Sequence, residues 1–453
     1  MKINASIIPK NVKIGIAVSG GMDSMALLHY LNARTSELEI EITVINVDHG
    51  LRGGNSVSDS AFVARYCMEN NIRFIQKTVG PSRYLSLKGS GTENAAREMR
   101  YAVFDGLLET DTVGFVLTAH HASDAAETVL LHLFRGSGTH GLSGIPEASG
   151  KYLRPMLSVK KRDIEKYVAE YNIPYVTDET NADNNFSRNL VRNKILPLAQ
   201  KINPSATEAI NNFSRRCAED DSYLSSLVPD EAVTVTDEGS KLTNWALNAP
   251  QPLFVRAVYK AFNLLEIFKD VENAHIDMLT ELRNMRAGSG FDFKNSVRAV
   301  RDYDGITLIK NEIQNTERKI QDTPAIPFGF GKFLLAGKTF AVEECKIADK
   351  IKSGRNYPPP AVRRPLFFDA GKIPENSVFR TRRDGDIITK FGGGTVKLKD
   401  YLIALKIPAR KRDGLVLLAS GGSVLLIAGV EISDAVKLTR ETANIGKISI
   451  MDL

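Results

Sequence analysis

The stretch "IGIAVSGGMDSMALLHYL", from Ile14 to Leu31, decides the fold of the N-terminal part of this chain. An apolar run, a Ser-Gly-Gly-Met-Asp-Ser hexapeptide and an amphipathic run follow one another, which predicts a strand, a tight loop and a helix. Glycines directly after a strand let backbone amides approach an anion, and the helix adds its positive N-terminal end. We therefore predict a phosphate-binding loop made of Ser19, Gly20, Gly21, Met22, Asp23 and Ser24.

This loop differs from a Walker A loop, because it contains no lysine and lacks the G-x-x-x-x-G-K-[ST] spacing. The Walker A lysine contacts the terminal phosphates of a nucleotide. Here the hydroxyls of Ser19 and Ser24 flank the amides, and Asp23 supplies a carboxylate that can hold Mg²⁺. The loop is therefore suited to pyrophosphate as a leaving group, and a plain strand-to-helix turn is the alternative.

Strands and helices alternate through the first 200 residues. Apolar, β-branched runs at 12–19, 40–47, 72–79 and 114–120 alternate with helical patterns at 22–33, 56–70, 92–109 and 124–135. Such alternation predicts an α/β fold with a doubly wound, Rossmann-like parallel sheet. We assign this domain to residues 1–204.

The rest of the chain divides into smaller parts. Residues 205–350 are predicted to be a mainly helical middle domain that ends in a strand-like patch. Residues 351–364 include three consecutive prolines and predict a stiff linker. Residues 365–453 predict a small α+β C-terminal domain.

The charge of the chain is unevenly placed. The formal net charge is +6, and residues 355–415 hold 14 Lys and Arg against 6 Asp and Glu. All of the basic excess therefore lies near the C-terminus, where either a solvated basic face or a surface for a polyanion explains it. The N-terminus lacks the apolar core of a signal peptide and no apolar run is long enough to span a membrane, so we expect a cytoplasmic protein with no membrane partner.

Further polar motifs follow the expected strands. "VDHGLR" begins at Val47, "ENAAREMRY" contains Arg97, and "TAHHASDAAET" runs from the fourth expected strand into a helix. Ligands of open α/β sheets bind at such strand ends. A zinc site, ordinary turns or a solvated basic stripe remain alternatives for these motifs, but we prefer carboxylates on Mg²⁺ and imidazoles on phosphate or substrate.

Taken in order and spacing, these motifs resemble those of the tRNA(Ile)-lysidine synthetase family, within the N-type ATP pyrophosphatases of the PP-loop kind. The resemblance is dense over residues 12–200 and resumes at "FRTRRDGD" and "KLKDYLIALKIPARKRD" near the C-terminus. It implies an adenine nucleotide alpha hydrolase-like catalytic domain and a C-terminal tRNA-binding domain. It also implies a reaction in which ATP adenylates the wobble cytidine of a CAU anticodon and the amine of free L-lysine displaces AMP.

The resemblance also implies roles for individual residues. ATP would contact the phosphate-binding loop together with Val47, Asp48 and His49, and Mg²⁺ would contact Asp23 and Asp124. The candidates for lysine, cytidine or the developing charge are Asp23, Arg97, His121, Asp124, Glu127, Arg188 and Arg192. The candidate tRNA contacts are Arg380, Arg382, Arg383, Lys397, Lys399, Arg410, Lys411 and Arg412.

The chain departs from the family pattern at Ser123, where a second aspartate is usual, and in "IAGVEIS", where an aromatic residue is usual before the glycine. The first departure bears on the binding of lysine.

Two other functions remain open: a tRNA thiolase of the same superfamily and an RNA-binding protein with a decayed ATP site. The three cysteines, Cys67, Cys217 and Cys345, are far apart in sequence, which disfavours the thiolase. A homodimer is left open as an alternative to a monomer.

Overall fold

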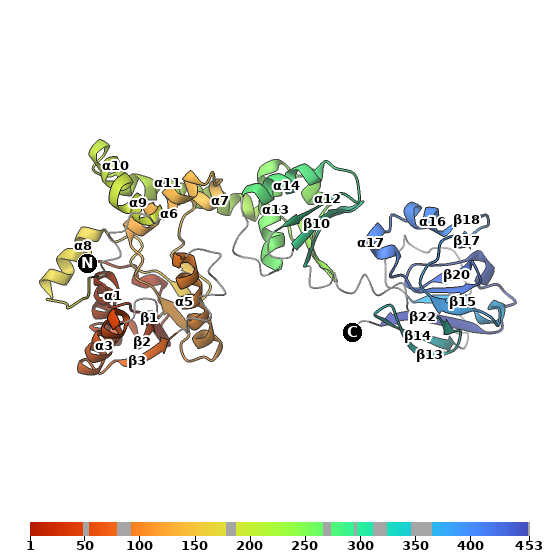
Figure 1. Ribbon diagram of the computed structural model, residues 1–453, viewed down its shortest axis with the longest axis horizontal. Coiled ribbons are helices and arrows are strands. Elements are labelled where there is room, and N and C mark those ends of the chain that lie inside the picture. Colours follow the sequence, from red (N-terminus) through yellow and green to blue (C-terminus); the bar gives the residue numbers. More distant parts are fainter. Residues whose placement is uncertain are drawn as a thin grey trace. The chain divides into compact units, whose positions relative to one another are not determined.

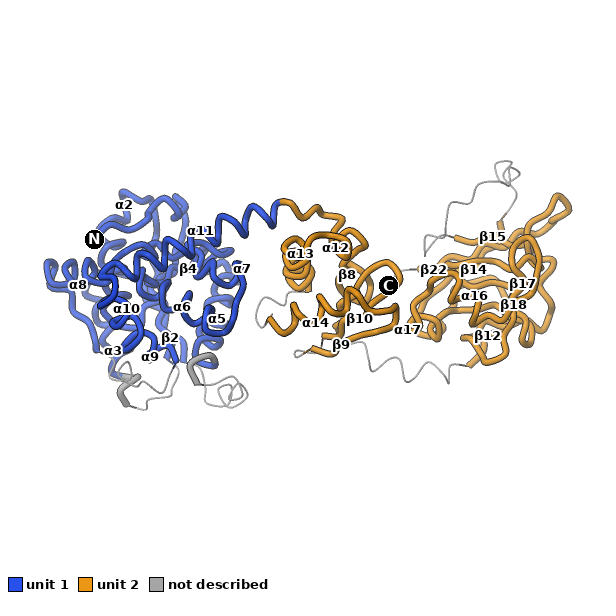
Figure 2. The backbone as a smooth tube through the Cα atoms, turned by 90° about the horizontal axis from the view of Figure 1, so that it is seen from above, with its two compact units in different colours: residues 1–226 blue, residues 227–453 orange. Residues whose placement is uncertain are grey.

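The computed structural model describes residues 1–48, 54–78, 92–177, 187–265, 273–293, 297–310, 324–345 and 365–451 (Figure 1). The chain forms two compact units, residues 1–226 and residues 227–453 (Figure 2). The predicted linker at 351–364 lies outside the described residues.

The first unit is built on a six-stranded sheet in the order β3-β2-β1-β4-β6-β5, in which all neighbours except β5 and β6 are parallel. This confirms the predicted Rossmann-like fold, and β5 and β6, of two residues each, are additional to the four expected strands. The strands are β1 (Val12–Ala17), β2 (Ile40–Asp48), β3 (Arg73–Thr78), β4 (Phe115–Leu117), β5 (Ala148–Ser149) and β6 (Tyr152–Leu153).

Helices follow the strands and cover both faces of the sheet. They are α1 (Met22–Asn32), α2 (Thr35–Leu38), α3 (Gly54–Glu69), α5 (Thr92–Glu109), α6 (Ala122–Phe134), α7 (Thr139–Leu142), α8 (Lys161–Glu170), α9 (Ser187–Leu190), α10 (Leu196–Ile202) and α11 (Ala206–Ser226). A π-helical turn, η4 (Val191–Ile195), joins α9 to α10. One core packs side chains of α1, α3 and α8 on one face, and a second packs α5 on the other. The central strands β1 and β2 are therefore largely buried, as their continuous apolar runs require, whereas the edge strand β3 is mostly exposed.

Helix α11 belongs to the first unit and not to the middle region, where the boundary at residue 204 would place it. Cys217 on α11 packs in one small core with Val129 of α6 and Leu142 of α7. An amphipathic helix is assigned by what it packs on, and its sequence alone does not name that surface.

The second unit begins with helices and an antiparallel sheet. As expected, helices occur here: α12 (Asn244–Asn248), α13 (Gln251–Leu264) and α14 (Asn273–Arg283). They pack with a sheet in the order β7-β8-β11-β10-β9. The predicted strand-like patch corresponds to β10 and β11, and the other three strands were not predicted. Its strands are β7 (Val233–Thr236), β8 (Gly239–Thr243), β9 (Gly290–Phe293), β10 (Val297–Arg301) and β11 (Gly305–Lys310).

The C-terminal part of this unit has two sheets, in the orders β12-β16-β19-β20-β17-β18, with β21 on β20, and β13-β14-β22-β15. Residues 324–345 belong here and not to the middle region, because β14 pairs with β22 along seven residue pairs. The strands are β12 (Ile326–Pro327), β13 (Gly331–Leu335), β14 (Lys338–Cys345), β15 (Leu366–Asp369), β16 (Val378–Arg380), β17 (Ile387–Thr389), β18 (Thr395–Lys397), β19 (Leu417–Ser420), β20 (Ser423–Ile427), β21 (Glu431–Ile432) and β22 (Ile445–Met451). The helices are α16 (Leu398–Ala404) and α17 (Ala409–Arg412).

Candidate active site

The phosphate-binding loop connects β1 to α1. Gly20 has a φ of +90°, in the left-handed region that favours glycine. The Ser24 hydroxyl donates to the Gly21 carbonyl at 2.9 Å, and the Ser19 and Ser24 hydroxyl oxygens are 3.4 Å apart. Two hydroxyls therefore meet where the amides of the loop and the N-terminus of α1 would face an anion.

Buried polar contacts hold this loop against the neighbouring strand. The Asn46 side chain of β2 donates to the Val18 carbonyl at 2.9 Å and accepts from the Ser60 hydroxyl of α3 at 2.8 Å. The Val176 amide donates to the Gly20 carbonyl at 2.9 Å. The loop is therefore fixed by packing and hydrogen bonds before any ligand binds.

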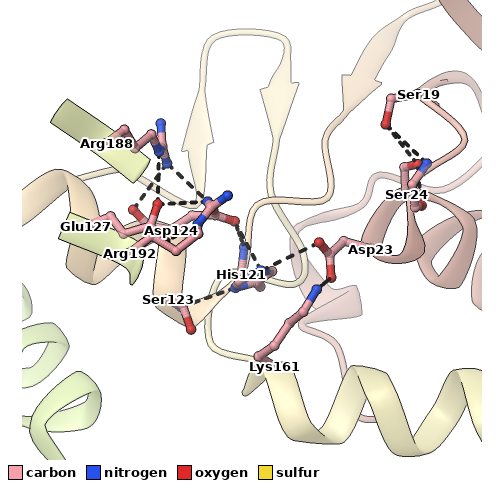
Figure 3. A network of polar contacts seen from close by, with 11 residues as sticks. Ser19, Asp23, Ser24, His121, Ser123, Asp124, Glu127, Lys161, Arg188 and Arg192 are labelled. Atoms are coloured by element: carbon pink, nitrogen blue, oxygen red, sulfur yellow. Dashed lines mark hydrogen bonds and ion pairs between the residues drawn. The ribbon is translucent and has the colours of Figure 1, made fainter. Parts of the chain in front are cut away.

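His121 links the end of β4 to the phosphate-binding loop. It is 5% exposed and caps α6: its Nδ1 accepts from the Ser123 amide at 3.2 Å, and its own amide donates to Asp124 at 3.0 Å. Its Nε2 lies 3.7 Å from Asp23 and 3.5 Å from Asp124 (Figure 3). Because Nδ1 accepts a hydrogen bond, Nε2 is the ring nitrogen that can donate, and it lies between the two carboxylates.

Asp124 and Glu127 of α6 pair with two arginines from a distant part of the chain. Glu127 is fully buried and accepts from Arg188 at 2.9 Å and from Arg192 at 2.6 and 2.8 Å. Asp124 accepts from Arg192 at 2.9 Å. The two arginines are four residues apart across α9 and η4, so both face α6 (Figure 3). Asp23 joins this cluster through His121. The structure thus brings together six of the seven catalytic candidates: Asp23, His121, Asp124, Glu127, Arg188 and Arg192.

The site holds an excess of positive charge around His120. Burial lowers the pKa of His120 to about 3, the Asp124 carboxylate opposes this, and neighbouring guanidinium groups lower the pKa further. These guanidinium groups belong to Arg154, Arg97 and Arg188. His120 is therefore neutral at physiological pH and is a weak base, while the cations around it favour an anionic ligand.

The titration of Asp124 limits its chemical role. Burial raises the pKa of Asp124, but the charges of His121 and Arg188 outweigh burial and hold the pKa below its ordinary value. A carboxylate with a lowered pKa accepts a proton from an amine poorly. Asp124 therefore suits orientation and charge balance better than general-base catalysis.

Lys161, the first residue of α8, is a site residue that the sequence motifs did not indicate. Its ammonium donates to the Asp23 carboxylate at 2.6 Å (Figure 3). The missed signal was a lysine at the start of a helix, soon after the Arg-Pro pair that follows β6. A lysine ammonium thus lies beside the phosphate-binding loop, and it comes from a residue 138 positions away.

We expect Lys161→Met to lower kcat/KM for ATP by about 100-fold, because a charge-assisted hydrogen bond near a phosphate contributes roughly 2–3 kcal/mol. Pyrophosphate release measures this. Arg162→Met is the matched control, since the neighbouring Arg162 side chain is 69% exposed. Equal effects of the two substitutions would contradict a role for Lys161.

The remaining candidates in this unit differ in how the structure places them. Arg97 is exposed on α5, with its guanidinium 4.9 Å from the ring centre of Tyr101. Its positive charge helps to lower the pKa of His120. Val47 and Asp48 end β2 beside β1, at the strand edge expected for adenosine. His49 lies outside the described residues.

Magnesium fits Asp23 better than Asp124. The Asp23 side chain is 31% exposed at the start of α1, and Mg²⁺ typically binds one or two carboxylates together with substrate phosphates. Both oxygens of Asp124 already accept hydrogen bonds, one from Arg192 and the other from the His121 amide. Within the described part of the chain, no three His, Cys, Asp or Glu side chains form a metal-binding group, so the zinc alternative gains no support.

The basic residues of the C-terminal part fall into two classes. Arg383, Lys397 and Lys399 are exposed and fit the predicted contact with a polyanion. Arg382 is partly buried and pairs with Asp413, and the Arg412 side chain donates to a backbone carbonyl at 2.9 Å.

Arg380 does not fit a tRNA contact, because it is 2% exposed and forms two hydrogen bonds with the buried Asp386, at 2.7 and 2.8 Å.

Arg410 also forms ion pairs with carboxylates of the protein itself. It pairs with Glu238 and Asp302 of the middle region. Burial alone would lower the pKa of Arg410, but these two carboxylates outweigh burial and raise the pKa above its ordinary value. Lys411 pairs with Glu238 at 3.0 Å. The sequence could not reveal these partners, since two of the three acidic residues lie more than 100 positions away.

Two family descriptions match this chain. Residues 2–199 match the PP-loop domain, and residues 378–450 match the TilS substrate C-terminal domain. These ranges contain the active-site cluster in the first unit and the exposed lysines of β18 and α16 in the second.

Relatives match the chain over nearly its full length. The tRNA(Ile)-lysidine synthase of Clostridium acetobutylicum is 29% identical over 98% of this chain and 96% of its own length. That of Clostridium perfringens strain ATCC 13124 is 30% identical with the same coverage, and that of Oceanobacillus iheyensis is 31% identical over 90% of this chain and 88% of its own. The similarity therefore covers both units.

Proposed function

This chain belongs to the tRNA(Ile)-lysidine synthase family, and on that premise we propose that it is a carbon–nitrogen ligase that joins free L-lysine to the wobble cytidine of a CAU anticodon. The observation that carries the proposal is the contact of His121 with both Asp23 of the phosphate-binding loop and Asp124 of the arginine cluster. This contact puts a pyrophosphate-binding element beside groups that can orient a second substrate.

In the first proposed step, the oxygen at carbon 2 of the cytidine attacks the α-phosphorus of ATP. A bond forms between oxygen and phosphorus, and pyrophosphate leaves. The loop amides, the Ser19 and Ser24 hydroxyls and Lys161 would stabilise the leaving pyrophosphate. A magnesium ion on Asp23 would supply further charge stabilisation to the phosphates.

In the second proposed step, the ε-amine of lysine attacks carbon 2. The carbon–nitrogen bond forms, the carbon–oxygen bond breaks, and AMP leaves with that oxygen while the amine loses a proton. No covalent protein nucleophile is needed, so positioning of the two substrates supplies most of the catalysis. Asp124 and Glu127 would hold Arg188 and Arg192 where the developing charge needs them.

The decisive assay is mass spectrometry of an isoleucine tRNA transcript with a CAU anticodon after incubation with ATP, Mg²⁺ and lysine. A mass gain of one lysine minus one water, dependent on ATP, is the expected result. A transcript in which the wobble cytidine is replaced by uridine is the matched control. No gain with the CAU transcript would overturn the proposal.

The thiolase alternative gains no support from the cysteines. Cys67 and Cys217 are buried in the first unit, and the partly buried Cys345 ends β14 in the second.

None of the helices described is long and apolar enough to cross a bilayer. We place the proposed reaction in the cytoplasm, where free lysine, ATP and tRNA are all present.

The basic C-terminal surface yields a prediction about tRNA. We expect the double substitution Lys397→Ala, Lys399→Ala to weaken tRNA binding by about 10-fold and to lower the salt dependence by about two counterions, because each lysine would neutralise one phosphate. Filter binding across a salt series measures both quantities. Lys10→Ala is the control, because that exposed lysine lies in the first unit. An equal loss of ATP binding would contradict this assignment.

A further inference from the structure

Arg154 is a buried cation at the active-site edge of the sheet, and none of the roles above uses it as a ligand contact. It directly follows β6, which pairs in parallel with β4, so it lies beside the strand end that leads to His120 and His121. Its charge contributes to the lowered pKa of His120. The phosphate-binding loop, the two histidines and Arg154 therefore follow three neighbouring strands, β1, β4 and β6.

Arg154 is 5% exposed and has no carboxylate partner among the described residues. Its Nη1 donates to the Pro146 carbonyl at 2.8 Å, and its Nε–H has no acceptor. The nearby Glu147 carboxylate instead accepts from the Asn4 side chain at 2.9 Å. Burial of a charged group without a counter-ion is costly, so such groups are normally paired or hold a ligand.

Arg380 provides an internal comparison within the same chain. It is as buried as Arg154 and also has an Nε without an acceptor, yet Asp386 neutralises it through two hydrogen bonds. An unbonded Nε is therefore not what distinguishes Arg154. The difference is that Arg154 lies beside a substrate site and no carboxylate in the described part of the chain pairs with it.

We propose that Arg154 binds the α-carboxylate of the amino-acid substrate. This inference rests on the proposed function and adds a binding residue to it. A guanidinium group and a carboxylate form parallel, charge-assisted hydrogen bonds, so a planar carboxylate is the anion that Arg154 matches best.

The position of Arg154 favours the amino acid over the other two anionic substrates. β6 is two strands from β1, a separation of about 10 Å, and it lies on the side opposite β2, where adenosine is expected. An extended lysine spans a comparable distance between its ε-nitrogen and its carboxylate. A phosphate of the bulky tRNA backbone would need an exposed partner, whereas a free amino acid is small enough to reach a guanidinium group that is only 5% exposed.

The first experiment uses the unaltered protein and two amines, lysine and lysinamide, in which a neutral amide replaces the carboxylate. Both carry the reacting ε-amine. We expect kcat/KM, measured as AMP release with the CAU transcript, to be about 10- to 100-fold higher for lysine, as for the loss of a charge-assisted hydrogen bond. Equal values for the two amines would overturn the inference.

The second experiment measures the same ratio in Arg154→Gln and Arg154→Lys. We expect the preference for lysine over lysinamide to fall to near one in Arg154→Gln and to an intermediate value in Arg154→Lys, because lysine keeps the charge without the planar fork. KM for ATP should stay within about twofold in ATP–pyrophosphate exchange. A purely structural role would lower both amines equally and leave the ratio unchanged, which would contradict the inference.

Two controls separate the remaining outcomes. Arg162→Gln, at an exposed arginine of α8, should keep the full preference. A rise in KM for ATP with an unchanged amine ratio would assign the Arg154 anion to a nucleotide phosphate instead. If the unaltered protein makes no lysine adduct at all, the proposed function fails; if it makes the adduct with an unchanged ratio in Arg154→Gln, only the Arg154 assignment fails. Should Arg154→Gln not fold by circular dichroism, the lysinamide comparison and Arg154→Lys decide.

Discussion

Replacement of Asp23 by asparagine is expected to lower kcat/KM for ATP-dependent tRNA modification by about 1,000-fold. The Asp23 carboxylate accepts a hydrogen bond from the Lys161 ammonium at 2.6 Å and lies 3.7 Å from His121 Nε2. Of the carboxylates at the site, it is the one best placed for magnesium. Asparagine has the same shape but no charge, so the magnesium binding proposed for Asp23 and the alignment of Lys161 would be lost together. Each of these contributes several kcal/mol to stabilisation of a phosphoryl transition state.

Pyrophosphate release and ATP–pyrophosphate exchange measure this effect. Asp163→Asn is the matched control, because that aspartate is 45% exposed on α8 and near Lys161 in sequence. The amides and hydroxyls of the loop remain in Asp23→Asn, so ATP binding should weaken by less than the rate. A loss below 10-fold would contradict the proposed role of Asp23 as a magnesium ligand.

The sequence predicted those parts of the fold that local pattern controls. A glycine-rich loop between an apolar run and an amphipathic run requires few distant contacts, and the parallel sheet follows from the strand–helix alternation. The short strand β6 could not be predicted in this way, because two residues carry no periodicity. Arg154 and Lys161, which follow β6, were therefore not assigned to the site.

The roles of charged residues depended on distant partners. Arg188, Arg192 and Arg380 are all arginines in polar motifs, yet the first two reach a buried glutamate of α6 and the third is neutralised by Asp386. The sequence gives no measure of burial, so the proposed tRNA contacts included Arg380 and Arg410, which the structure pairs with carboxylates of the protein itself. The pairing of β14 with β22 also joins segments that are distant in sequence. For this reason, residues 324–345 belong to the C-terminal part and not, as the sequence predicted, to the middle region.

The substitution with the largest expected effect on stability is Glu127→Gln. Glu127 is fully buried, and it neutralises Arg188 and Arg192 through hydrogen bonds of 2.6 to 2.9 Å. Glutamine keeps the volume but removes the charge, which leaves two partly buried guanidinium groups with Asp124 as their remaining described counter-ion. Loss of one partner from a buried ion pair costs about 3–5 kcal/mol, so we expect a decrease of that size in the free energy of unfolding.

Urea denaturation followed by circular dichroism measures the decrease, and Glu219→Gln is the control. Glu219 pairs with Arg215 on the surface of α11, where both side chains are about 60% exposed, so its loss should cost less than about 1 kcal/mol. The double substitution Glu127→Gln, Arg192→Met should recover part of the stability, because it removes one of the uncompensated charges. If Glu127→Gln costs no more than Glu219→Gln, Asp124 alone balances both arginines, and Glu127 would then be dispensable for holding them at the site.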